Sequence, residues 1–138
     1  MKNIFYEYHR DKSTNMAIFY GKNNVAKPHF HRNLEIMVDI LQYINMHYKE
    51  PLTLEGVASA FGYNKYYFSR IFNRYIGESL SNYINVVRVQ NFMRAANEEK
   101  NPQISRLAEE CGFESMPTFY RAFEKLYGES PKKYFGKN

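Results

Sequence analysis

The amino-acid sequence predicts an all-α protein, and three observations support that fold class. The stretch at residues 54–84 occurs again at residues 104–135, and an internal repeat constrains the architecture before any single element is considered. From residue 34 onward, apolar residues recur at steps of three and four, which is typical of amphipathic helices. No stretch after residue 33 alternates apolar and polar residues as a half-buried strand does.

The two copies of the repeat match at positions that set helix packing and helix ends. Each copy predicts a short helix, a turn that contains glycine, and a longer helix that carries arginine and lysine, which together outline a helix-turn-helix motif. The second copy has one extra residue before its longer helix. The matched pairs are Ala58 and Ala108, Gly62 and Gly112, Tyr63 and Phe113, Phe68 and Phe119, Arg70 and Arg121, Phe72 and Phe123, Gly77 and Gly128, Ser79 and Ser130, and Tyr83 and Tyr134.

Capping and breaking residues place the expected elements in order. Residues 1–33 predict two short strands and a turn, or an irregular segment. Thr53, Asn64 and Ser130 stand where helix N-caps are expected, and Pro131 follows as a first helical residue. The expected helices are 34–48, 54–60, 65–75, 79–97, 104–110, 115–127 and a short one after Ser130.

These elements predict two regions in one chain. A segment at 1–33 precedes a helical domain at 34–138 made of two helix-turn-helix subdomains. Within that domain we expect the first helix-turn-helix motif at about 53–77, a linker helix at about 79–97 and the second motif at about 103–128.

Composition narrows the class of protein. With 44% hydrophobic residues the chain can bury a core, and its formal charge of +5 suits a polyanionic partner. The single cysteine excludes an intrachain disulfide and fits a reducing cytoplasm; we expect Cys111 to be a buried core residue. No apolar run approaches the ~20 residues of a membrane span. No catalytic constellation or cofactor motif is present, so we expect neither an enzyme nor a cofactor.

The helix at 65–75 has the features of a DNA-reading helix. Its apolar stripe should face the core, and the opposite face carries no acidic residue. Arg70 can donate two hydrogen bonds to guanine in the major groove, and Tyr66 and Ser69 can reach neighbouring base edges. Lys65 is better placed for phosphates. We expect the same role for Asn73 and Arg74.

The helix at 115–127 predicts a weaker reader. Its outer face carries Met116, Thr118 and Arg121 as base-contacting candidates, and Lys125 as a phosphate contact. Pro117 lies in the first turn and has no N–H to donate to a base. Glu114 and Glu124 offset the positive charge, so we expect fewer or less specific contacts from this helix.

The linker helix has a length suited to two grooves of one DNA site. About 19 residues span about 28 Å at 1.5 Å per residue, and successive major grooves on one face of B-DNA are about 34 Å apart. We therefore expect the helices at 65–75 and 115–127 to enter adjacent major grooves.

The second copy carries three motifs in a specific order and spacing: Ile104-x-x-Leu107-Ala108-x-x-Cys111-Gly112-Phe113, Phe119-x-Arg121-x-Phe123 and Gly128-x-Ser130-Pro131-x-x-Tyr134. Through these motifs, residues 34–138 resemble the AraC/XylS family of bacterial transcription regulators, and Arg88 matches an arginine near the start of the family's linker helix. The resemblance implies a seven-helix DNA-binding unit that often contacts RNA polymerase. It also implies that Tyr66, Ser69, Arg70, Met116, Thr118 and Arg121 face bases.

The chain departs from the family pattern at two places. Phe92, Ala95 and Ala96 stand where the family usually has a small residue followed by two leucines, which indicates a size exchange in the linker packing. Pro117 is the other departure, and it bears on base reading by the second helix.

The segment before the helices resembles the start of the family's cupin-like sensor, where a His-x-His-x-x-x-Glu run lies on a strand. A metal site from His29, His31 and Glu35 is the alternative function for it, because alternate strand residues face one side. A hairpin cannot enclose a small-molecule pocket. We therefore expect inducer-independent DNA binding, mainly by a monomer, with weak strand-mediated dimers as the alternative.

Two function classes remain open from the sequence. The first is sequence-specific binding of double-stranded DNA with regulation of transcription. The second is an interaction fragment that titrates a full-length regulator or the polymerase without regulated DNA binding. Salt-dependent DNA binding separates them, because a pure titrator shows little specific affinity.

Overall fold

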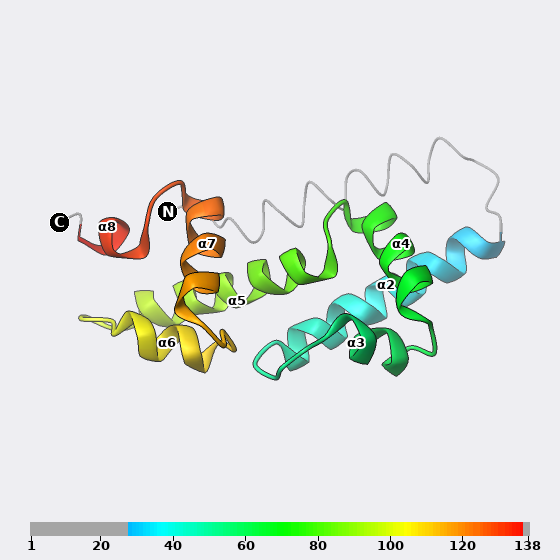
Figure 1. Ribbon diagram of the computed structural model, residues 1–138, viewed down its shortest axis with the longest axis horizontal. Coiled ribbons are helices and arrows are strands. Elements are labelled where there is room, and N and C mark those ends of the chain that lie inside the picture. The colour runs from blue at the N-terminus through cyan, green and yellow to red at the C-terminus, as the bar shows by residue number, and fades with distance from the viewer. Residues whose placement is uncertain (1–27, 137–138) are drawn as a thin grey trace. The chain divides into compact units, whose positions relative to one another are not determined.

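The computed structural model describes residues 28–136, and the side chains within that range from Asn33 onward. This part of the chain holds seven helices and no strand, so the predicted all-α class is confirmed (Figure 1). The helices are α2 (Pro28–His47), α3 (Leu54–Ala60), α4 (Lys65–Ile76), α5 (Leu80–Asn97), α6 (Ile104–Glu110), α7 (Met116–Tyr127) and α8 (Pro131–Phe135).

The first helix begins earlier than the sequence indicates. Residues from Pro28 to residue 36 are helical rather than the sensor-like strand, so that prediction is wrong. Proline is tolerated in a first helical turn because the N–H it lacks has no partner inside the helix. The metal-site hypothesis for His29, His31 and Glu35 assumed a strand, and alternate residues do not share one face of a helix. The strands expected before Pro28 lie outside the described residues.

The predicted caps are confirmed at the atomic level. The amide of Gly56 donates to Thr53 Oγ1 at 3.0 Å, and the amide of Tyr67 donates to Asn64 Oδ1 at 2.9 Å. Ser115 and Ser130 accept the corresponding bonds at the starts of α7 and α8. Because an N-cap of this kind contributes about 1 kcal/mol, the starts of both longer helices of the repeat are set locally.

The described residues fall into two compact units. The first comprises 28–46 and 52–81 and includes α2, α3 and α4. In it, α3 packs against α4, and the ring of Tyr43 on α2 meets Phe61 edge-on at 5.5 Å. Phe68 and Phe72 stack at 6.0 Å and are fully buried. One face of α4 is therefore closed off by the core of its unit.

The second unit comprises 47–51 and 82–136 and is built around phenylalanine rings. Phe92 on α5 lies 4.7 Å from Phe119 and 6.1 Å from Phe123, both on α7. The same ring meets Phe135 of α8 at 6.0 Å. Phe92 thus fills a position where the family usually has a small residue. Cys111 is buried in this cluster as expected, and burial raises the pKa of its thiol.

A buried arginine holds the segment after α2 inside the second unit. Arg88 on α5 is 9% exposed; its Nε donates to the carbonyl of Tyr48 at 2.8 Å, and its Nη2 donates to the carbonyl of Glu50 at 2.9 Å. Burial lowers the pKa of Arg88. Because a buried unpaired carbonyl or guanidinium is costly, these bonds tie the 48–50 backbone to the linker helix.

The turn between α6 and α7 lies against that same backbone. Gly112 has φ +99°, and a Cβ there would stand 2.4 Å from the carbonyl oxygen of Tyr48 and 2.9 Å from Arg88 Nε. The matched glycine of the first copy, Gly62, has φ +77° and no atom within 4 Å of such a Cβ. Both turns need a residue in the left-handed backbone conformation, but only the turn at Gly112 also lies close to other atoms.

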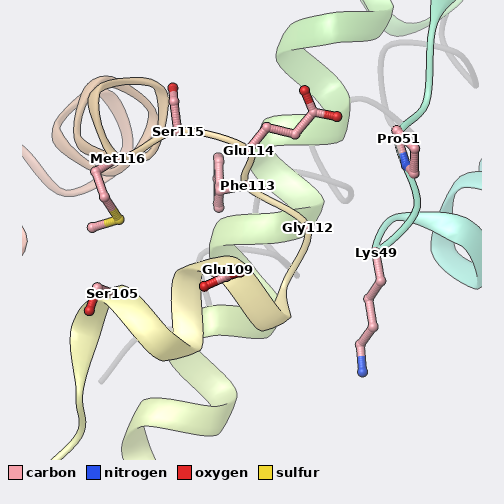
Figure 2. Close-up of a pocket in the computed structure, with 9 residues that line it drawn as sticks. All are labelled: Lys49, Pro51, Ser105, Glu109, Gly112, Phe113, Glu114, Ser115 and Met116. Atoms are coloured by element: carbon pink, nitrogen blue, oxygen red, sulfur yellow. The ribbon is translucent and has the colours of Figure 1, made fainter.

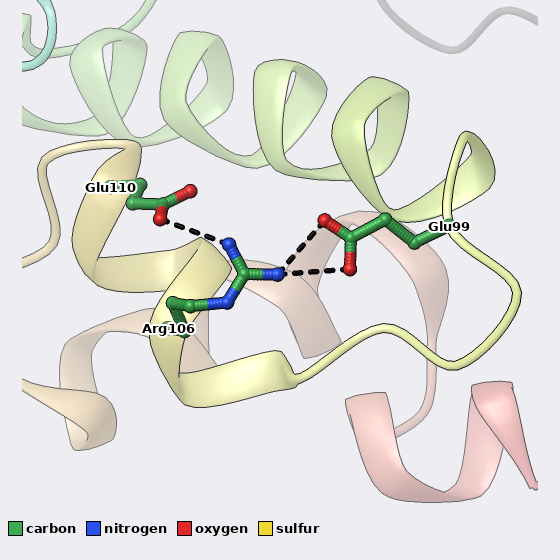
Figure 3. A network of polar contacts seen from close by, with 3 residues as sticks. All are labelled: Glu99, Arg106 and Glu110. Atoms are coloured by element: carbon green, nitrogen blue, oxygen red, sulfur yellow. Dashed lines mark hydrogen bonds and ion pairs between the residues drawn. The ribbon is translucent and has the colours of Figure 1, made fainter.

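An exposed ion network fixes the start of α6 to the loop that follows α5. Arg106 Nη2 donates to both carboxylate oxygens of Glu99 at 2.9 Å, and Nη1 donates to Glu110 at 3.0 Å (Figure 3). The hydrogen bonds that Arg106 donates, first those to Glu99 and then that to Glu110, raise the pKa of Arg106. Solvent screens the network, so its main effect is to orient the two ends of the loop.

Along the described residues, no helix combines the length and apolar character needed to cross a lipid bilayer.

The two matched glycines make an internal test of crowding. Gly62→Ala should lower the free energy of unfolding by about 1 kcal/mol, because the only cost is the strain of alanine in a left-handed backbone conformation. Gly112→Ala should cost about 3 kcal/mol, because its methyl group also displaces the Tyr48 carbonyl and the Arg88 bond. Urea unfolding of both variants measures the difference. Equal losses would contradict the close packing of this turn.

Candidate nucleic-acid interface

The buried side of α4 dictates which residues face outward. Phe68, Ile71 and Phe72 are buried with Tyr75 in the first unit. The residues on the opposite side are exposed and follow the spacing i, i+3, i+4 and i+7, which forms one continuous stripe on a helix. We call it the α4 stripe; its members are Tyr66, Ser69, Arg70 and Asn73.

A tyrosine pair that the sequence analysis missed supports Arg70. The guanidinium carbon of Arg70 lies 5.9 Å from the centre of the Tyr67 ring, and that ring lies 5.3 Å from the ring of Tyr63. A cation over an aromatic face is held by the ring's quadrupole. The signal was present in the sequence, because a tyrosine three residues before an arginine on a helix can meet it.

Lys65 is less available for a phosphate than its sequence position indicates. Its Nζ forms an ion pair with Glu55 of α3 at 3.3 Å and lies 5.3 Å from the centre of the Tyr66 ring. A backbone hydrogen bond in the first turn of α3, and then the Lys65 ammonium, lower the pKa of Glu55. At neutral pH the ionised Glu55 carboxylate therefore holds the Lys65 ammonium, and an external anion would have to compete with it for this lysine. Arg74, the other cation expected to meet phosphates from this helix, is exposed in its last turn.

The exposed side of α7 forms a stripe of the same spacing. Phe119, Ala122 and Phe123 are buried in the second unit. The opposite residues are exposed at i, i+3, i+4 and i+7. We call this the α7 stripe; its members are Pro117, Tyr120, Arg121 and Glu124, and Lys125 is exposed beside it.

Two of the predicted base contacts of α7 lie beside the α7 stripe rather than on it. Met116 and Thr118 are each partly buried. Thr118 Oγ1 accepts hydrogen bonds from the hydroxyl of Ser115 at 2.9 Å and from Arg121 Nη2 at 3.4 Å. Thr118 thus joins the helix cap to Arg121, and it orients that side chain.

A cavity of about 450 Å³ adjoins the start of α7 (Figure 2). Lys49 and Pro51 line one side, and Glu109, Glu114 and Met116 line the other. The charges on its walls have both signs, so the cavity does not select an anion or a cation. Among the described side chains, no group of three histidines, cysteines or carboxylates could hold a metal ion.

Comparison with known proteins identifies the chain. The family model described as a helix-turn-helix domain matches residues 57–137. The multiple antibiotic resistance protein MarA of Escherichia coli K12 is 36% identical over 95 residues, which cover 69% of this chain and 74% of MarA. The chain belongs to the AraC family. The predicted resemblance is confirmed, and with it the class of DNA-binding transcription regulators.

Solved structures agree with the fold of this AraC-family chain. The C-terminal domain of the response regulator AraT from Geobacillus stearothermophilus aligns with a TM-score of 0.62 at 30% identity, over 75% of this chain and 85% of that one. The DNA-binding domain of the transcriptional factor AdpA, solved with a target DNA, aligns with a TM-score of 0.64 at 22% identity, over 72% of this chain and 89% of that one.

The ion pair between Glu55 and Lys65 can be tested through its effect on DNA binding. In Glu55→Gln, Lys65 loses its partner and becomes free to meet a phosphate. Affinity for DNA at about 0.1 M salt should rise several-fold, and the slope of log K against log salt should steepen by up to about one. Fluorescence anisotropy across a salt series measures both.

The control for this variant is Glu35→Gln, which makes the same charge change on α2. It should leave the salt slope nearly unchanged. An equal effect of the two variants would show that net charge, rather than the release of Lys65, determines the result.

Proposed function

We propose that this AraC-family regulator reads one specific site in double-stranded DNA with α4 and α7, which enter adjacent major grooves. The observation that carries the proposal is the matched pair of exposed stripes, one on each longer helix of the repeat. A recognition helix must present one face to base edges and bury the other in its own domain. Both helices meet that requirement with the same spacing.

The residues divide between base reading and positioning. We propose that Tyr66, Ser69 and Arg70 read bases from α4, and that Arg121, flanked by Met116 and Thr118, does so from α7. Arginine donates two hydrogen bonds to guanine O6 and N7, the commonest specific contact in the major groove. Phosphates carry no sequence information but set the register, and the residues proposed for them are Lys65, Asn73, Arg74 and Lys125.

The length of the linker helix α5 supports the proposal that one chain reaches two adjacent major grooves. The 18 residues of α5 make a helix about 27 Å long at 1.5 Å per residue. A continuous helix is a stiff spacer, so a single chain can carry two readers of one site. We propose that the protein acts as a monomer in the cytoplasm, contacts RNA polymerase and catalyses no reaction.

Arg70→Ala and Lys65→Ala should weaken DNA binding in different ways. Loss of Arg70 should cost about 1–3 kcal/mol on the specific site and relax the preference at one base pair, because a bidentate base contact disappears. Loss of Lys65 should weaken all sequences alike and reduce the salt slope by about one or less, given its pair with Glu55. Binding to a panel of single-base variants of the site distinguishes the two. An unchanged base preference in Arg70→Ala would refute the reading role of the α4 stripe.

The two halves of the site should respond unequally to arginine removal. Arg121→Ala should cost less affinity than Arg70→Ala, because the α7 stripe also carries the acidic Glu124 and Pro117, which cannot donate a hydrogen bond. Footprinting should then show stronger base-specific protection in the half read by α4. Equal losses in affinity would contradict this asymmetry, and the absence of any specific protection would favour a titrating interaction fragment.

A further inference from the structure

Exposed large apolar side chains gather on the two recognition helices. Of the five among the described residues, three are tyrosines on α4 or α7; the five are Val38, Met46, Tyr66, Tyr67 and Tyr120. Tyr66 and Tyr67 already have roles beside Lys65 and Arg70. Tyr120 is 42% exposed, and none of the proposed contacts uses it.

Tyr120 occupies a position where the two copies of the repeat differ in chemistry. Along the stripes, Tyr66 corresponds to Pro117, Ser69 to Tyr120, Arg70 to Arg121 and Asn73 to Glu124. Every member of the α4 stripe can donate a hydrogen bond. On the α7 stripe, Pro117 has no polar side-chain group and ionised Glu124 only accepts. The first turns of α7 therefore present the proline ring of Pro117 and the aromatic ring of Tyr120 at the positions that Tyr66 and Ser69 occupy on α4.

The geometry favours contact between these two rings and base edges. Residues near the N-terminus of a recognition helix are the ones that meet bases. Pro117 and Tyr120 are one turn apart in that part of α7, and both are exposed. The Tyr120 ring is 5.8 Å from the ring of buried Phe119, which limits its freedom.

One group in the major groove suits such rings. Thymine carries a 5-methyl group there, and apolar side chains recognise it by contact rather than by hydrogen bonding. Cytosine and the purines lack this methyl group.

We infer that Tyr120, with Pro117 beside it, determines specificity by packing against thymine methyl groups in the half of the site read by α7. The inference rests on the proposed function and adds a base identity to it. On α4 the position that matches Tyr120 is Ser69, which has no ring to pack on a methyl group, so loss of a thymine methyl there should matter less.

Deoxyuridine in place of thymidine tests the inference, because it removes the methyl group and leaves base pairing intact. The full chain first selects its site from random double-stranded DNA, and Arg70→Ala and Arg121→Ala assign the halves by footprinting. Each half is then synthesised with deoxyuridine. In the α7 half, affinity should fall about fourfold for each contacted methyl group. In the α4 half it should change less than twofold.

Two variants connect the effect to the side chain. Tyr120→Ser gives the second copy the serine that the first copy has at the matching position, Ser69. This variant should bind the thymine and deoxyuridine sites equally. Tyr120→Phe keeps the ring without the hydroxyl and should retain the fourfold discrimination. Tyr120→Phe should match the parent in thermal unfolding, and Tyr120→Ser, which loses only the ring contact with Phe119, should unfold slightly earlier but remain folded in the binding assay.

The outcomes separate this inference from the proposal beneath it. A specific site that has no thymine in the α7 half, or that tolerates deoxyuridine there, would overturn the inference and leave the proposed function standing. Methyl discrimination that survives in Tyr120→Ser would also overturn it. A chain that selects no sequence at all would overturn both.

Discussion

Burial of phenylalanine pairs sets the rotation of both recognition helices, and the interface depends on that rotation. Phe68 and Phe72 on α4, and Phe119 and Phe123 on α7, are fully buried in their respective units. Removing any one of these rings from water is worth about 2–3 kcal/mol, so turning either helix would expose more apolar surface than any outward contact could offset. The exposed stripes are the consequence of this constraint.

The second copy of the repeat carries a further constraint that the first lacks. Arg88 binds the Tyr48 and Glu50 carbonyls, and Gly112 lies against the same backbone. The turn that leads into α7 therefore lies against the 48–50 backbone, whereas Gly62 has no such neighbour. This contact holds the turn before α7 in place in addition to the cap at Ser115.

The repeat places two different sets of outward side chains on one scaffold. The matched glycines, caps and buried rings reproduce the same turn and helix, while the outward positions are free to diverge because they make no core contact. On α4 they are hydrogen-bonding groups around Arg70, which Tyr67 supports. On α7 they include proline, tyrosine and a glutamate. The two halves of a DNA site would then be distinguished by different chemistry.

The sequence by itself determined the helices of the repeat, the caps at Thr53, Asn64 and Ser130, and the face of α4 that carries Arg70, because spacing and capping are local properties of the chain. It misplaced the start of α2, where a short motif suggested a strand. Only the tertiary structure decided the Glu55–Lys65 pair, the Arg88 bonds and the crowding at Gly112. Each of these depends on how the elements pack, which periodicity does not encode.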